Sequence, residues 1–520
     1  MARGGVGHWD AGRCGSVRRV SAAEVAVALP QGAEAGEKGL KANALGYGAN
    51  VVIGVASTAP AYSLAATLGF IVAVPGVGVH APAVLLVAFF PMLLVALGFK
   101  YLNRADPDCG TSFAWTTRAF GPWVGWINGW ALFIADVLVM ASLAVIAAQY
   151  SYLLVGWDSA AGSTTGIVAG SVVWIAAMTW ICYRGIELSA RVQLFLLAAE
   201  VTILSAFALV ALVKVYGTAA PPHSLRPSLE WLNPFGLSLS ALVDGVLLGI
   251  FIYWGWDTSL SVNEESQDAR EAPGSAAVLS TILLVLIYVV VSVAAQAYGG
   301  THVLAANSDD VLGVLGKNVF GSPWDKLLIV AVLTSASAST QTTILPTART
   351  TLSMARWGAL PAAFGRVHSR FLTPTVSTIG MGAVSVVWTV LLVVLDPSGD
   401  VLGDSVSAIG FAIAFYYGFT GLASAWYFRR ELRRGAGVLL RVGLLPLLGG
   451  VAMFAVFGKA FHDYSLRANA YAKPVFGIQV PIAIGIGALL LGLPLMALAA
   501  LRLPRFFRRP TETAPSDLPL

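Results

Sequence analysis

The sequence predicts an all-α integral membrane protein with about twelve transmembrane helices. Of its 520 residues, 57% are hydrophobic and only 11% are charged, whereas an average soluble domain is about 25% charged. A soluble chain this apolar could not cover its own core, so lipid must be part of its solvent. The apolar residues also gather into blocks that are long enough to cross a bilayer, which takes roughly 20 residues per helix. The blocks are 45–75, 80–102, 113–152, 164–183, 188–216, 238–261, 276–298, 324–353, 375–395, 404–428, 437–458 and 478–503.

The distribution of basic residues predicts the orientation of these spans. If the N-terminus lies inside and twelve spans alternate, 25 of the 32 Lys and Arg residues fall on the cytoplasmic side and 7 on the outer side. This asymmetry is what the positive-inside rule requires, and a missed helix would scatter it. We therefore expect a multi-pass protein of the cell membrane with both termini in the cytoplasm. Residues 1–40 are expected to form a disordered tail, and residues 504–520 a solvated end.

The sequence lacks the residues that are characteristic of several functional classes. The three cysteines, Cys14, Cys109 and Cys182, form neither a disulfide framework nor a metal cluster. No GxxxxGK[ST] motif for nucleotide binding occurs, and no convergent set of nucleophile, His and carboxylate suggests an enzyme. We expect no metal, no cofactor beyond a coupling ion, and no nucleic-acid partner. The chain is expected to act as a monomer or a homodimer.

The first span contains a stretch of small residues followed by proline in its middle. Small residues permit an unwound backbone, and proline removes a hydrogen-bond donor. The freed amides and carbonyls could then bind a substrate carboxylate and a cation. The alternative is a kinked helix whose small residues allow close packing. The candidate binding residues are Gly54, Ala56, Ser57, Thr58 and Pro60.

The sixth span has a second candidate break, in which aromatic residues surround a glycine. An interfacial aromatic belt is the alternative, but four aromatic residues within six positions favour a pocket wall. Two interrupted helices at corresponding positions of two repeats indicate a transporter site. The ends of such half-helices attract anions at the N-terminal side and cations at the C-terminal side. The candidate residues here are Phe251, Tyr253, Trp254 and Gly255.

Four motifs lie at residues 54–60, at 102–113 with 120–122 and 129–130, at 255–266 with 272–273, and at 347–349 with 354–361. In this order they resemble the amino acid–polyamine–organocation permease superfamily. The resemblance implies a 5+5 inverted-repeat (LeuT-like) fold in which helices 1 and 6 are discontinuous. It also implies substrate binding by the two broken backbones, and alternating access around that site. The implied organisation is repeat 1 at 41–216, an extracellular loop at 217–237, repeat 2 at 238–430, and two further spans at 431–503.

Two departures from the family pattern concern the site itself. The first break is often Gly-x-Gly-x-Gly in the family, whereas Gly54, Ala56 and Thr58 occupy the corresponding positions here. Some proton-coupled relatives carry a lysine in span five, and the nearest counterpart here is Glu200.

Polar residues inside spans are costly and therefore functional candidates. Glu200 could bind and release a proton, neutralise a substrate amine, or remain a protonated partner of a neighbouring helix. Asp136 in span three is comparable, although no motif surrounds it. The resemblance to sodium-coupled members of this fold implies Ser335 and Ser339 of span eight as candidate sodium ligands, although such hydroxyls often only pack between helices. We expect H⁺ or Na⁺ as the coupling ion, and the acidic residue in span five favours H⁺.

Three carboxylates, those of Asp257, Glu264 and Glu265, follow the aromatic residues of span six. We expect them at the inner end of the span, as a cytoplasmic gate with arginine or backbone partners. The function that these features indicate is secondary active transport of amino acids, coupled to protons. The alternative is a transporter or exchanger of polyamines or other amines with the same fold, which additional acids such as Asp136 would favour. A receptor or an enzyme fits less well.

Overall fold

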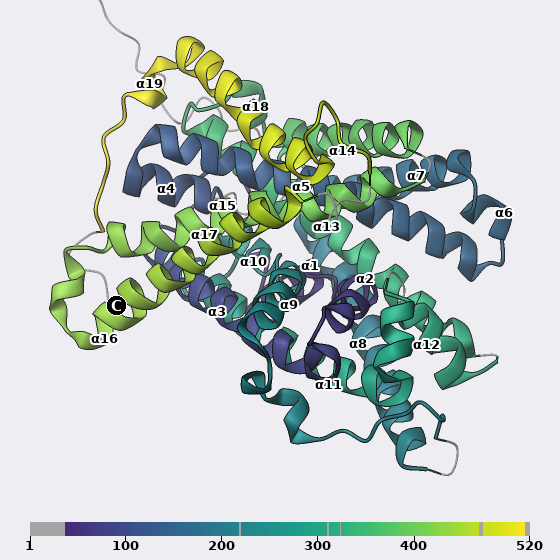
Figure 1. Cartoon of the computed structure of the whole chain (residues 1–520). Coiled ribbons are helices and arrows are strands. Elements are labelled where there is room, and N and C mark those ends of the chain that lie inside the picture. Colours follow the sequence, from purple (N-terminus) through teal and green to yellow (C-terminus); the bar gives the residue numbers. More distant parts are fainter. Residues whose placement is uncertain are drawn as a thin grey trace, which may run out of the picture.

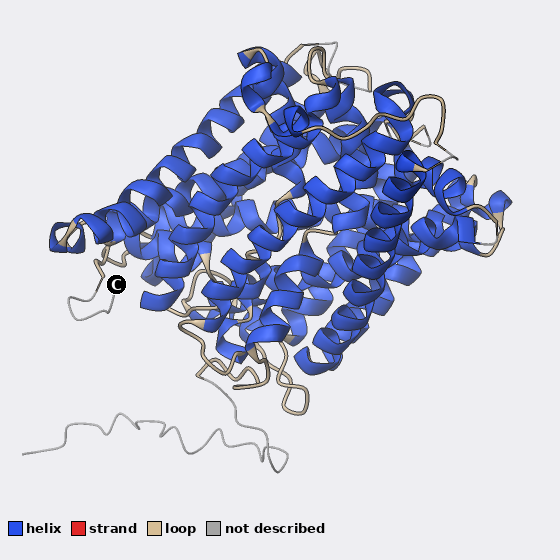
Figure 2. Cartoon of the chain, turned by 90° about the horizontal axis from the view of Figure 1, so that it is seen from below, coloured by secondary structure: helices blue, strands red, loops and turns tan. Residues whose placement is uncertain are grey.

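The described part of the chain is helical throughout. The computed structural model describes residues 37–217, 220–308, 311–322, 324–396, 398–466 and 472–514, and every regular element within them is a helix (Figure 2). Eleven helices among these residues are long and apolar enough to span a membrane. The all-α integral membrane fold is thereby confirmed. Most of the predicted N-terminal tail, residues 1–36, lies outside the described residues.

The helices follow the predicted blocks closely. The first five spans are α1 Tyr47–Ser57 with α2 Pro60–Ala73, α3 Ala81–Ala105, α5 Pro122–Leu154, α7 Thr164–Arg184 and α8 Ile186–Tyr216. The next five are α9 Leu239–Ile252 with α10 Thr258–Ser261, α11 Ala272–Ala306, α13 Leu327–Arg356, α14 Thr375–Leu395 and α15 Asp400–Tyr427. The last two are α17 Leu445–Tyr464 and α18 Val480–Arg502. Short helices between or after them are α4 Ser112–Phe120, α6 Asp158–Ala161, α12 Val311–Phe320, α16 Ala436–Val438 and α19 Pro504–Phe507.

The sixth crossing is divided between two helices. α9 has 14 residues, so it rises about 21 Å, which is less than the roughly 30 Å hydrocarbon core of a bilayer. The irregular residues 253–257 and the short α10 continue the crossing. The expected discontinuity of helices 1 and 6 is present in both spans.

The interrupted helices lie near the middle of the bundle. α1, α2, α9 and α10 are surrounded by longer helices (Figure 1). α1 packs against α8, α11 and α13, and α10 packs against α1, α11 and α13. α5 is largely buried within the bundle, whereas α18 packs against α15 and α5 and leaves most of its surface exposed. Apolar side chains exposed in this way are suited to contact with lipid.

One end of the bundle carries most of the Lys and Arg residues that the structure describes, and we call it the basic end. It comprises residues 37–46, 104–112, 184–186, 262–272, 356–374, 428–436 and 503–514. Most of the described residues 504–514 of the expected C-terminal tail are exposed, but two of them are buried against the bundle. Phe506 is buried and stacks on Phe113 with ring centroids 5.8 Å apart, and the Ala514 N–H donates to the Tyr427 carbonyl. Burial of an aromatic ring drives this docking.

Candidate substrate site at the two helix breaks

The first break lies between α1 and α2. α1 ends at Ser57, Ala59 adopts a left-handed conformation with φ 47°, and Pro60 begins α2. A non-glycine residue in this conformation costs free energy and persists only where its surroundings enforce it. The Thr58 hydroxyl donates to the Val55 carbonyl, at 2.8 Å. The break therefore has its own local hydrogen bonds and is more than a kink.

The three candidate ion-coupling residues all contact this break. The Ala61 N–H donates to Glu200 Oε1 at 2.7 Å, and the Tyr62 N–H donates to Ser335 Oγ at 3.2 Å. Both amides belong to the first turn of α2, where no intrahelical acceptor is available. The Ser339 hydroxyl donates to the Ser57 carbonyl at 2.9 Å. Glu200 is completely buried, and it lies at the positive end of the α2 dipole.

The second break meets the first through a glycine. Gly255 has φ 119°, which side chains rarely permit. A Cβ atom there would lie 2.8 Å from the Ser57 carbonyl oxygen. The Ser57 and Thr258 hydroxyls are also 2.8 Å apart and share a hydrogen bond. Gly255 thus allows the two breaks to approach each other through their backbones.

Aromatic and acidic side chains join the second break to α15. Trp254 Nε1 donates to the Tyr416 hydroxyl. The hydroxyls of Tyr416 and Tyr417 donate to the Asp257 carboxylate at 3.1 and 2.8 Å. Asp257 is buried within the break, so it lies apart from the inner-end position that we expected for a gate. It belongs with the candidate binding residues.

A second buried carboxylate lies beside Asp257. Asp136 of α5 accepts a hydrogen bond from the Thr347 hydroxyl. Asp136, Asp257, Ser57 and Gly255 line a cavity of about 10 Å³, which is room for about one water molecule. Two acids therefore converge on the point where the two breaks meet.

A larger cavity leads from the end opposite the basic end toward the breaks. Its volume is about 620 Å³, and its wall is mostly apolar. Tyr62 and Phe251 line its deep end, and Ala73, Val74 and residues 398–403 line its outer part. The Tyr62 hydroxyl also donates to Ser142 Oγ at 3.1 Å. We call this cavity the vestibule.

Comparison with known proteins identifies the family. A model of the amino acid permease family matches residues 51–499, which include both breaks and the vestibule. The chain belongs to the amino acid permease family. The permease is 24% identical to an arginine/ornithine antiporter of Latilactobacillus sakei over 56% of its own length and 61% of that relative. It is 23% identical to the branched-chain amino acid permease BcaP of Lactococcus lactis, over 76% and 84% of the two chains. It is 24% identical to cationic amino acid transporter 3, mitochondrial, of Arabidopsis thaliana, over 72% and 61%.

A buried ion pair closes the basic end of the permease below the breaks. The Arg349 guanidinium donates two hydrogen bonds to the Glu265 carboxylate, at 2.9 and 3.0 Å. Both side chains are 0% exposed. The sequence motif at residues 347–349 contains this arginine, but nothing in the motif marks it as the partner of Glu265. The bidentate geometry fixes the segment after α10 to α13.

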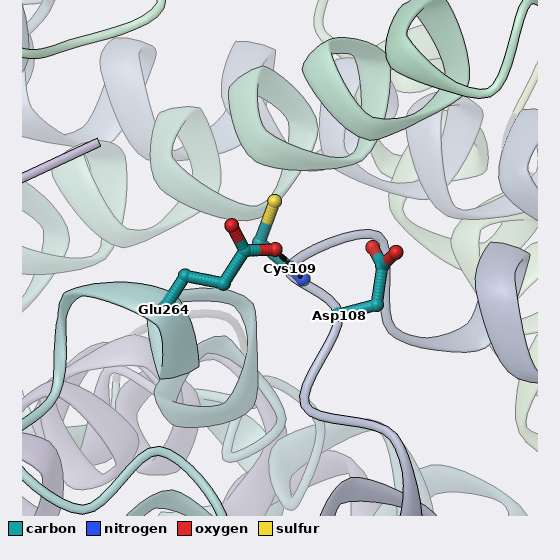
Figure 3. A group of neighbouring side chains, drawn as sticks. All are labelled: Asp108, Cys109 and Glu264. Atoms are coloured by element: carbon teal, nitrogen blue, oxygen red, sulfur yellow. Dashed lines mark hydrogen bonds between the residues drawn. The ribbon is translucent and has the colours of Figure 1, made fainter. Parts of the chain in front are cut away.

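Lys38 binds the other predicted gate carboxylate. Its ammonium lies 2.6 Å from Glu264 and 2.7 Å from Asp108, and Glu264 also accepts the Cys109 N–H at 2.9 Å (Figure 3). Burial alone would raise the pKa of Asp108, but the charge of Lys38 and several hydrogen bonds hold this pKa below its usual value. Asp108, Cys109 and Glu264 offer ligand atoms within 4.8 Å of one another. The ammonium of Lys38 supplies the positive charge that a metal ion would otherwise bring.

The sequence did not reveal the contribution of α15. Tyr416 and Tyr417 are about 160 positions from Asp257, and nothing in their local sequence marks them as partners of a carboxylate. The pair of adjacent tyrosines inside an apolar span is a signal that could have been noted, because a buried hydroxyl usually finds a partner.

Proposed function

We propose that the permease moves amino acids across the cell membrane by alternating access, as a proton-coupled secondary active transporter. The observation that carries this proposal is the meeting of the two breaks at Ser57 and Gly255, between the vestibule on one side and the closed basic end on the other. A site in this position is exposed to one side of the membrane at a time. Opening of the basic end would then require separation of the Arg349–Glu265 and Lys38 ion pairs. We place both termini in the cytoplasm on the basis of the positive-inside asymmetry.

Groups beside the breaks are suited to bind both the carboxylate and the ammonium group of an amino acid. The N–H groups of Gly255 and Trp256 donate no hydrogen bond to any described residue, so they are available for a substrate carboxylate. Asp136 and Asp257 are available for an ammonium group. The cavity between them is small in this structure, so binding would require the Trp254–Tyr416 contact to open toward the vestibule.

The pair of acids supports a second candidate, a substrate with an additional amine. One carboxylate suffices for an α-ammonium group, and the second would bind a side-chain cation. The names of two relatives, an arginine/ornithine antiporter and a cationic amino acid transporter, agree with this candidate. A polyamine would use the two acids but not the free amides.

Uptake into proteoliposomes tests these proposals. The labelled solutes are leucine, arginine, ornithine and putrescine, which is ornithine without its α-carboxyl group, each with an imposed proton gradient or an imposed sodium gradient. We expect ornithine or arginine to accumulate with the proton gradient and putrescine to be excluded. Equal uptake of putrescine and ornithine would favour the amine transporter, and absence of uptake for all four solutes would contradict both candidates.

Glu200→Gln should abolish proton-driven accumulation while it leaves exchange intact. A glutamine cannot bind and release a proton, but its carbonyl can still accept the Ala61 N–H that Glu200 accepts at 2.7 Å. The measurement compares accumulation under a pH gradient with exchange of labelled for unlabelled substrate at equal pH. Accumulation should fall to its level without a gradient. Ser339→Ala in parallel tests the sodium alternative, and normal proton-driven accumulation by Glu200→Gln would remove this residue from coupling.

A further inference from the structure

A second polar cavity lies at the basic end, away from the helix breaks. Its volume is about 210 Å³, and it is formed where α7 ends, α8 begins and the loop between α13 and α14 folds back. The charged residues of its lining are Lys41, Arg184, Arg191, Arg370 and Glu187. Four cationic groups and one carboxylate give this lining a net charge of +3. We call it the basic pocket.

The arginines of the basic pocket lack acidic partners. Lys41 pairs with Glu187 at 2.7 Å, but Arg184, Arg191 and Arg370 form no ion pair with any described residue. Three other arginines at the basic end do have carboxylate partners. Arg104, Arg118 and Arg349 pair with Glu271, Asp106 and Glu265. The basic pocket thus concentrates positive charge that the protein itself does not neutralise.

The loop that supplies Arg370 is held in a fixed shape. Leu372 has a positive φ of 52°, and the Thr373 hydroxyl donates to the Tyr183 carbonyl at the end of α7, at 2.8 Å. The Phe371 ring contacts two guanidiniums, at 5.1 Å from Arg184 and 5.6 Å from Arg370. Strained backbone that the surroundings enforce is often found at binding sites, and cation–π contacts restrict the motion of the two arginines.

Helix geometry adds to the attraction for anions. α8 begins at Ile186, in the floor of the basic pocket, after Gly185 with φ 135°. The first amides of this 31-residue helix have no intrahelical acceptor, and they point out of the N-terminal end of the helix. A helix N-terminus with guanidiniums around it suits a phosphate group, because arginine offers several N–H donors in a fixed plane.

The surroundings place the basic pocket at the membrane surface. Trp180, one turn before Arg184, is 55% exposed, and its ring lies 5.3 Å from the Arg184 guanidinium. Leu188, which lines the pocket, is 42% exposed. Exposed tryptophan is typical of the interface between headgroups and acyl chains. Basic pockets between spans at this level can bind anionic headgroups.

We propose that the basic pocket binds a phosphate group, supplied by the headgroup of an anionic phospholipid or by a phosphate in solution. The apolar neighbours Trp180 and Leu188 favour the lipid as the source. The proposal does not depend on the transported substrate or on the coupling ion.

The test compares the permease with two double variants in detergent. Arg184→Gln/Arg370→Gln removes two charges from the basic pocket, and Arg433→Gln/Arg508→Gln removes two exposed charges from elsewhere at the same end. Binding of fluorescently labelled phosphatidylglycerol is titrated, with phosphatidylcholine carrying the same label as the neutral lipid. We expect the pocket variant to bind phosphatidylglycerol about 30-fold more weakly, because each of the two basic residues contributes a factor of about five. The control variant should bind as the unaltered protein does.

A competition arm distinguishes the two sources of phosphate. Millimolar inorganic phosphate that displaces the labelled lipid, and that binds the unaltered protein without lipid, assigns the site to a phosphate in solution. Lipid binding that resists phosphate assigns it to a headgroup. Equal weakening in both double variants, or equal binding by all three proteins, overturns the proposal. Matching unfolding temperatures of the three proteins show that the substitutions, all at exposed side chains, leave the fold intact.

Discussion

Arg349→Gln should lower the free energy of unfolding of the permease by about 3–5 kcal/mol, because it leaves the Glu265 carboxylate buried without its counter-charge. Both side chains are 0% exposed, and the guanidinium makes two hydrogen bonds to the carboxylate. Loss of one partner leaves a charge for which neither water nor a nearby cation can compensate. Thermal unfolding followed by tryptophan fluorescence measures the effect.

A matched double variant separates the loss of a pair from the creation of an unpaired charge. Arg349→Met/Glu265→Leu removes both charges and fills a similar volume, so it should recover most of the stability that the single variant loses. Labelling of Cys109 with a maleimide reports on closure, because this thiol is buried at the basic end. Both proteins in this comparison have Cys14 and Cys182 replaced by serine. We expect Cys109 to be labelled faster in Arg349→Gln than in the protein that keeps Arg349. If Arg349→Gln unfolds at the same temperature as the unaltered protein, the ion pair does not stabilise the fold.

Asp257→Asn should raise the KM for the transported amine about 100-fold. Removal of the carboxylate charge that would pair with a buried ammonium weakens the binding free energy by about 2–5 kcal/mol. Each 1.4 kcal/mol corresponds to a factor of ten in affinity. Asparagine keeps the size of the side chain and can still accept the Tyr417 hydroxyl, which Asp257 accepts at 2.8 Å. The break should therefore keep its shape, and the change should appear in KM more than in the maximal rate.

The control for this experiment is another carboxylate of span six. Asp244 lies in α9, pairs with Lys459 at 2.7 Å and has a side chain that is 44% exposed. Asp244→Asn should leave KM within about twofold of its original value, since exposed ion pairs contribute little. If Asp257→Asn and Asp244→Asn behave alike, the acid at the break has no part in binding.

Local sequence was sufficient to locate the breaks but not their partners. Pro60 lacks an amide hydrogen, and the glycine between the aromatic residues of span six has an unusually permissive backbone. These properties do not depend on the rest of the fold, so the local sequence reveals them. Glu200 stood out because a carboxylate inside a span is costly. Its contact with the Ala61 N–H could not be predicted, since it joins residues 139 positions apart.

One difference from the sequence-based expectations has a physical cause. Asp257 was expected at the inner end because it leads into Glu264 and Glu265, but the tyrosine hydroxyls of α15 stabilise it inside the break. Residues 504–514 are mostly exposed, and Phe506 anchors them to the bundle, since burial of one aromatic ring contributes about 1.5–3 kcal/mol.

The contact between Gly255 and the Ser57 carbonyl has a mechanical consequence. Gly255 brings no side chain to this contact, so no bulky group on it interlocks with Ser57 and holds one orientation. We expect this point to act as a pivot, on which one half of the protein can tilt against the other while the distance between the segments stays nearly constant. The orientation would then be set by the salt bridges at the basic end and by whatever occupies the vestibule.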